Sequence, residues 1–125
     1  MSNIVDSSGW LEYLADGPNA SEFAPVIGDT AALIVPSISL YEVFKRVLQQ
    51  RTEVEALQSV AMMQQGQVVE LDSVLASSAA KLSVTLKLPM ADSIILATAY
   101  AYNATLWTQD ADFRGLSGVR YIGRI

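Results

Sequence analysis

Short apolar runs alternate with longer amphipathic segments along this chain. The runs at residues 3–6 (NIVD), 31–35 (AALIV), 68–71, 104–108 (ATLWT) and 119–122 (VRYI) are predicted strands. The segments at 10–14, 18–28, 37–50, 52–65, 72–86 and 89–103 have apolar positions at helical spacing and are predicted helices. Because the strand runs are continuously apolar, they predict a parallel sheet that is covered by helices on both faces. The pattern therefore predicts an α/β fold with four to five strands.

Turn and cap residues indicate where the helices begin and end. Ser37 is the expected cap of the helix that follows Pro36, and the helices 37–50 and 52–65 together form a predicted helical hairpin. Pro89 is expected as the first residue of the helix 89–103. That helix is apolar on nearly every side, which predicts that it packs between other elements.

The residue types that are missing restrict the possible chemistry. The 125 residues have the length of one domain, so we expect a single domain over 1–125. The chain contains neither Cys nor His, which excludes disulfides, thiolate chemistry, the usual zinc sites and triads based on imidazole. A metal site would have to use oxygen ligands, which favours hard cations such as Mg²⁺ or Mn²⁺.

Charge and hydropathy narrow the expected location and partners. The net charge of −5 argues against a broad basic face for nucleic acid, so any such contact should be local. The sequence has no signal-peptide pattern and no stretch of about 20 apolar residues, so we expect a cytoplasmic protein without a membrane segment. Apolar residues make up 51% of the chain, which is explained either by a partner that covers apolar surface or by tightly packed alanine-rich helices.

The most informative stretch is WTQDADF, residues 107–113, which places Asp110 and Asp112 directly after an apolar run. Two unit charges about 4 Å apart repel by roughly 4 kcal/mol near a protein surface. Asp6 occupies an equivalent position after the first predicted strand. Since ligands bind outside the carboxyl ends of parallel strands, Asp6 and Asp110 are expected at one binding edge. The repulsion between Asp110 and Asp112 has to be offset by water, by a cation or by protonation.

Each of these acids also has a simpler explanation. Asp6 is a suitable helix N-cap, and Asp110 is a favoured turn residue. For Asp112, capping or solvation explains the residue at least as well as binding of a metal. The sequence leaves these alternatives open.

Asp92 lies in the first turn of the apolar helix 89–103, where the helix dipole favours a carboxylate by about 0.3 to 1 kcal/mol. A buried ionised carboxylate nevertheless needs a partner, and no Lys or Arg occurs between Lys87 and Arg114. A cation shared with Asp6 and Asp110 would supply that partner.

Glu42 is the acid whose position the pattern explains least. Helical periodicity places Glu42, Lys45, Arg46 and Gln49 on one side of the helix 37–50, which favours a solvated polar face with weak ion pairs. If this face instead borders the acidic cleft, Lys45 and Arg46 would lie where a phosphate backbone could be held.

Four motifs together resemble a known family. VDSSGWLEYL at the start, Glu42 in the helix after the second strand, ADSIILATAY and WTQDADF resemble the PIN domain, especially the small ribonuclease toxins of the VapC type. The resemblance covers essentially the whole chain and implies a three-layer α/β/α fold. It implies that Asp6, Glu42, Asp92 and Asp110 form an acidic tetrad for Mg²⁺ or Mn²⁺, with Asp112 as a variable fifth acid. It also implies a homodimer and a small cognate antitoxin that covers the active site.

The expected activity is metal-dependent hydrolysis of RNA. Thr108 and Ser7 are candidates for orienting the carboxylates through their hydroxyl groups, although strand propensity and capping explain them equally well. Gly9 stands where relatives carry a larger apolar residue, a difference that concerns packing.

A phosphotransfer module is an alternative interpretation, but an aspartyl phosphatase would have a second Asp where this chain has Ser8. The alternative from another class is a non-catalytic PIN-like module that binds a metal or a peptide.

Overall fold

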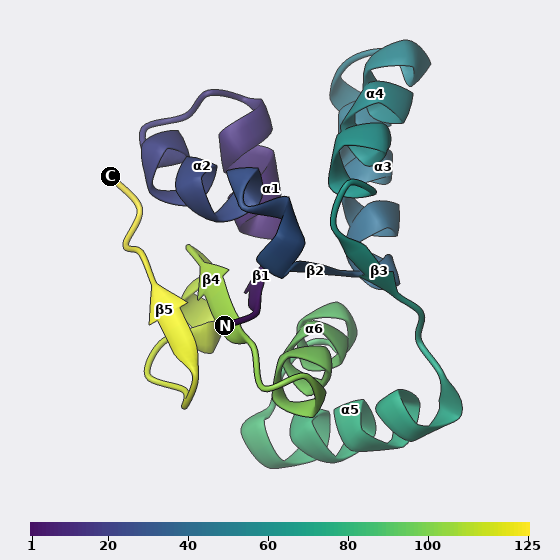
Figure 1. Cartoon of the computed structure of the whole chain (residues 1–125). Helices are drawn as coiled ribbons and strands as arrows, with labels where there is room; N and C mark the ends of the chain where they lie inside the picture. Colours follow the sequence, from purple (N-terminus) through teal and green to yellow (C-terminus); the bar gives the residue numbers. More distant parts are fainter.

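The computed structural model describes residues 1–125 and contains five strands and six α-helices (Figure 1). The strands are β1 (Asn3–Val5), β2 (Leu33–Pro36), β3 (Gln67–Val69), β4 (Thr105–Thr108) and β5 (Val119–Tyr121). The helices are α1 (Ser7–Leu14), α2 (Ala20–Gly28), α3 (Ser37–Gln50), α4 (Glu53–Met63), α5 (Ser73–Leu86) and α6 (Met90–Ala101). Two short 3₁₀ helices, η1 (Thr30–Ala32) and η2 (Ala111–Phe113), precede β2 and follow β4.

All five strands form one parallel sheet in the order β3-β2-β1-β4-β5. In the register, Ile4 lies opposite Ile34 on one side and Leu106 on the other. The order reverses direction between β1 and β4, so these two strands flank the switch point of the sheet, where ligands bind in open α/β folds. The predicted α/β fold with a parallel sheet is confirmed.

Helices cover both faces of the sheet, which confirms the three layers (Figure 1). Neighbouring strand residues point to opposite faces. Ile4 and Ile34 pack with residues of α5 and α6, whereas Val5 and Val35 pack with residues of α1 to α4. The α3–α4 pair forms the predicted hairpin beside the sheet (Figure 1).

Helix α6 is the apolar helix that the sequence places inside the molecule. Its residues 93–99 are all buried.

No single helix is long and apolar enough to cross a membrane. Helices α5 and α6 reach the required length and apolar composition only as a pair, and that pair is bent by 116°.

Several predicted element ends differ from the structure by one to three residues. The second strand, expected at 31–35, begins only at Leu33, because the first two of these residues belong to η1. Ser37, expected as an N-cap, is the first residue of α3, and Pro89, expected as a first helical residue, precedes α6. The N-cap residues are Pro36 and Pro89, with an extended ψ of 136° and 158°. The rings fix φ but leave ψ free to continue the preceding extended segment. Leu71, expected in the third strand, is 43% exposed and follows the end of β3, because the chain has already turned toward α5.

Gly9 is required where α1 approaches its neighbours. A Cβ on Gly9 would lie 2.6 Å from Val5 Cγ1 and 2.8 Å from Phe23 Cε1. The missing side chain therefore lets α1 lie close to both β1 and α2. The difference at Gly9 concerns packing, as the sequence suggests, and it also brings the Gly9 N–H toward the acidic edge of the sheet.

Candidate metal centre

Asp6 is the first residue after β1 and is 2% exposed. Its carboxylate accepts hydrogen bonds from Gly9 N at 2.9 Å, Ser8 Oγ at 2.8 Å and Thr108 Oγ1 at 2.7 Å. The Asp6 N–H donates to Trp107 O at 3.1 Å, which holds the residue against β4. The N-cap role expected for Asp6 is confirmed, and the capping carboxylate lies at the switch point of the sheet.

Thr108 connects Asp6 to Asp110. Its hydroxyl accepts the backbone N–H of Asp110 at 2.9 Å, so its own proton is directed at Asp6 Oδ2. Asp110 in turn accepts the N–H of Asp112 at 2.9 Å and caps η2, which confirms the expected turn role. The hydrogen bonds of the Thr108 hydroxyl with Asp6 and with the N–H of Asp110 therefore support its expected orienting role.

Asp92, Asp110 and Asp112 come together at this edge, with one carboxylate oxygen of each lying within 4.8 Å of those of the other two. Asp92 comes from the first turn of α6, whereas Asp110 and Asp112 come from the loop after β4. Asp92 and Asp110 are half-buried, and Asp112 is exposed. These three carboxylates come from the last third of the sequence, and Asp6 is linked to them through Thr108.

Burial and mutual repulsion raise the pKa values of two of these carboxyl groups. Burial raises the pKa of Asp92 to about 8, helped by the charges of Asp110 and Asp6 and by a hydrogen bond with Asp112. Burial also raises the pKa of Asp6 to about 6, although the hydrogen bonds from Thr108, Gly9 and Ser8 lower it. A positive charge at this edge would stabilise the ionised forms of both groups.

The donor set fits a hard divalent cation. Only carboxylate oxygens are present, and their separation of up to 4.8 Å is compatible with an ion whose ligands lie about 2.0 to 2.6 Å away, as for Mg²⁺ or Ca²⁺. The chain contains no Cys or His that would favour zinc or copper. Asp92, Asp110 and Asp112 could therefore hold a metal ion.

Glu42 is not one of the three converging carboxylates, and its side chain contacts Ser7, the residue after Asp6. It is half-buried on α3 and accepts a hydrogen bond from Ser7 Oγ at 2.6 Å. The solvated face expected from periodicity is found for Lys45 and Arg46, which are exposed, but only partly for Glu42. The wheel of α3 cannot show that α1 packs against this side and offers a hydroxyl donor.

Three polar residues of this region were not identified from the sequence. Ser8 contacts both carboxylate oxygens of Asp6, and Asn19 and Gln109 are each 3% exposed and joined by a hydrogen bond of 3.1 Å. The position of Ser8, two residues after Asp6, could have indicated this contact, because a hydroxyl there lies within reach of the capping carboxylate. No such indication existed for Asn19, because its partners are remote in the chain.

A parallel sheet with carboxylates gathered at its switch point defines a class of acidic-site α/β proteins that includes metal-dependent nucleases. The family model of the PIN domain matches residues 4–119. The chain therefore belongs to the PIN domain family, and the resemblance noted in its four motifs is confirmed.

Solved structures with the same fold include a toxin and toxin–antitoxin assemblies. A toxin–antitoxin complex from Klebsiella pneumoniae matches with a TM-score of 0.78 at 22% identity, covering 97% of this chain and 100% of the other. VapC20 of Mycobacterium tuberculosis, a toxin described as cleaving the sarcin–ricin loop, matches with a TM-score of 0.77 at 16% identity and covers 95% and 99%. VapBC2 from Rickettsia felis, bound to promoter DNA, matches with a TM-score of 0.75 at 14% identity and covers 98% of each chain. No curated protein matches the sequence.

Proposed function

We propose that this protein is a metal-dependent endoribonuclease that hydrolyses RNA phosphodiester bonds, and that it is the toxin of a toxin–antitoxin pair. The observation that carries the proposal is the convergence of Asp92, Asp110 and Asp112 beside the buried Asp6 at the switch point of the sheet. Membership of the PIN family supports a nuclease, and the fold likeness to VapC20 supports RNA as the substrate. We regard residues 1–125 as one PIN domain acting in the cytoplasm.

Asp6, Glu42, Asp92 and Asp110 are the proposed ligands of Mg²⁺ or Mn²⁺, with Asp112 as a fifth. When bound, the ion supplies Lewis acidity and neutralises charge at a phosphodiester. The protein holds the ligands in place: Thr108 orients Asp6 and Asp110, and Ser7 orients Glu42 at 2.6 Å. Water is the nucleophile of the proposed hydrolysis, so the reaction needs no side-chain nucleophile. The absence of Cys and His from the chain is therefore compatible with it.

The protein partners of the proposed toxin are a small antitoxin and a second copy of the chain. Known VapBC assemblies have the same fold. Large apolar side chains are exposed on the α3–α4 hairpin, including Tyr41 at 59% and Val54 at 63%, and on α5, where Val84 is 82% exposed. Exposed apolar surface of this kind is typical of protein interfaces. Light scattering of the purified protein, with and without its co-expressed genomic neighbour, tests both partners.

Cleavage of a mixed pool of structured RNAs tests the activity. The purified protein is incubated with the pool in Mn²⁺ or Mg²⁺, with EDTA and Asp92→Asn as controls. Cuts that require both the metal and Asp92 support the proposal. A metal-dependent rise in melting temperature without any cleavage, in a preparation free of bound inhibitor, would favour the non-catalytic metal- or peptide-binding module.

A further inference from the structure

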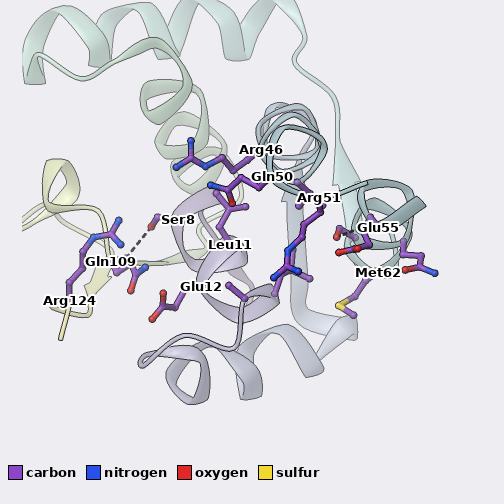
Figure 2. A pocket seen from close by; sticks show the side chains of 15 residues that line it. Ser8, Leu11, Glu12, Arg46, Gln50, Arg51, Glu55, Met62, Gln109 and Arg124 are labelled. Atoms are coloured by element: carbon purple, nitrogen blue, oxygen red, sulfur yellow. Dashed lines mark hydrogen bonds between the residues drawn. The ribbon is translucent and has the colours of Figure 1, made fainter. Parts of the chain in front are cut away.

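A polar pocket of about 640 Å³ opens beside the acidic edge, between α1, α3, α4 and the C-terminal tail (Figure 2). It reaches the site at Ser8 and Gln109, and the backbone N–H of Gln109 donates to Ser8 Oγ at 3.4 Å. Three of the five arginines of the chain, Arg46, Arg51 and Arg124, line this pocket. We call it the arginine pocket.

The arginine pocket concentrates positive charge on an acidic protein. Elsewhere, the cationic groups of Lys45, Arg114 and Arg120 lie over the rings of Tyr41, Tyr121 and Trp107 at 5.6, 5.9 and 5.0 Å. The arginine pocket instead has three guanidinium groups against two carboxylates, Glu12 and Glu55. It is therefore locally positive, although the whole chain has a net charge of −5.

Asn19 holds one wall of the arginine pocket together. Its side-chain amide donates to Gln109 Oε1 at 3.1 Å and to Gly123 O at 3.0 Å, and its backbone N–H donates to Glu12 Oε2 at 2.7 Å. Asn19 is 3% exposed and its bond to Gln109 is buried, so this bond is shielded from water. The three bonds fix the C-terminal tail beside the end of β4 and turn the Glu12 carboxylate toward the α1–α2 loop.

This arrangement places Arg124 in the wall of the arginine pocket that Gln109 also lines. Figure 2 shows Arg124 beside Gln109 on one side of the arginine pocket, with Arg46 and Arg51 extending from the region of α3. Tail residues are usually poorly ordered unless they are tied down. The bond from Asn19 to Gly123 supplies that restraint one residue before Arg124.

We propose that the arginine pocket binds the sugar–phosphate backbone of the RNA strand adjoining the scissile bond, through Arg46, Arg51 and Arg124. Asn19 acts as a positioning residue for Arg124. This inference rests on the proposed nuclease function and extends it to the path of the substrate. Guanidinium groups match phosphate oxygens in a bidentate geometry. The contact of the pocket with Ser8, which itself donates to Asp6, makes it continuous with the site and favours RNA over an acidic peptide.

Binding of a fluorescein-labelled, single-stranded RNA of mixed sequence tests the proposal. Fluorescence anisotropy is measured without added divalent metal, over a range of salt concentrations, for wild type and for Arg46→Gln, Arg51→Gln and Arg124→Gln. Each lost phosphate contact should reduce the salt slope by about 0.7 and weaken binding about fourfold at 0.15 M salt. Arg120→Gln is the matched control and should change neither quantity, because Arg120 lies over Trp107 outside the pocket.

A double-mutant cycle tests the role of Asn19. If Asn19 acts by holding the tail, Asn19→Ala should weaken RNA binding as Arg124→Gln does, and the double variant should be no weaker than either single variant. Should Asn19→Ala fail to fold, Asn19→Leu replaces it, because leucine has a similar volume but cannot donate to Gln109 Oε1 or Gly123 O, and it should reproduce the affinity and the salt slope of Arg124→Gln.

Unchanged affinity and salt slope in all three arginine variants would overturn the proposal. It would also be overturned if these variants bound RNA normally but lost binding to polyglutamate, because the pocket would then be a peptide site. Cleavage by the wild type in Mn²⁺ is measured alongside. Wild-type cleavage with normal RNA binding by the variants refutes only the RNA path, whereas variant-sensitive binding without cleavage refutes only the nuclease.

Discussion

Asp6 and Asp92 lie at the same edge of the sheet, and burial raises the pKa of both, but their surroundings differ. Asp6 receives hydrogen bonds from Gly9, Ser8 and Thr108, and its pKa rises only to about 6. Asp92 shares a hydrogen bond with another carboxyl group, Asp112, and its pKa rises to about 8. Hydrogen-bond donors stabilise the ionised form, whereas neighbouring carboxylates destabilise it.

The comparison separates two functions of an acidic residue. Asp6 belongs to the fold, because it caps α1 and joins β1 to β4. Asp92 instead faces the carboxylates of Asp110, Asp6 and Asp112, and a cation bound at the cluster would stabilise its ionised form. Substitutions at the two ends of the site should therefore have opposite effects on stability and on metal binding.

The largest effect is expected for Asp92→Asn. Cleavage should fall to background and the metal-induced rise in melting temperature should disappear, because one ligand is lost. The metal-free protein should be as stable as the wild type or more stable, since the amide needs no proton to stay neutral beside Asp110 and Asp6, whereas the carboxyl group has to keep one. RNA cleavage assays and thermal melts with and without Mn²⁺ measure these changes.

Asp29→Asn provides the control for that substitution, because Asp29 is an exposed acid after α2 whose side chain makes no capping hydrogen bond. It should leave cleavage and metal response unchanged. A metal response that survives in Asp92→Asn, together with a loss of about 0.5 to 2 kcal/mol in Asp92→Ala, would instead indicate a capping role for Asp92.

Thr108→Val should reduce stability by about 1 to 3 kcal/mol, because it removes a buried donor to Asp6 and an acceptor for the N–H of Asp110. Chemical denaturation gives the free energy of unfolding. Thr105→Val on the same strand is the matched control and should change it by no more than about 0.5 kcal/mol. Equal effects of the two substitutions would contradict the proposed rigidity of the Asp6 end.

The stability of the metal-free protein should fall as the pH rises from about 4 to about 8. Over this interval the unfolded chain releases the proton of Asp92, while the folded chain retains it up to its pKa of about 8. Asp6 contributes in the same direction up to about pH 6. Urea denaturation across this pH range should show a flatter profile for Asp92→Asn. Identical profiles for wild type and variant would contradict the raised pKa of Asp92.

The smallest effect is expected for Ser7→Ala, which removes the hydrogen bond to Glu42 Oε1. Metal affinity should fall by about tenfold, the lower end of the range for residues that orient ligands, while stability should change little. Calorimetric titration with Mn²⁺ measures the affinity, and Ser21→Ala on the exposed side of α2 is the control. An unchanged affinity would place Glu42 outside the metal centre.

Sequence patterns predicted those features of the protein that depend on residues close together in the chain, above all its strands and helices. Continuous apolar runs identified the strands, and their carboxyl ends indicated where Asp6 and Asp110 would meet. The helix ends at Pro36 and Pro89 were displaced because ψ of a proline is decided by the neighbouring strand or loop. The surroundings of Glu42 could not be predicted, because a helical wheel describes one helix and the hydrogen-bond donor to Glu42, Ser7, belongs to another.

The sequence by itself determined the α/β fold and the absence of Cys and His chemistry, because these follow from periodicity and residue type. It also indicated which acidic residues are candidates for the site. Only the tertiary structure decided how each acid is held. The hydroxyl of Thr108 reaches Asp6 across 102 positions, and Asn19 joins Gln109 across 90. Hydrogen bonding and burial at such separations depend on the packing of the whole sheet, which no local pattern contains.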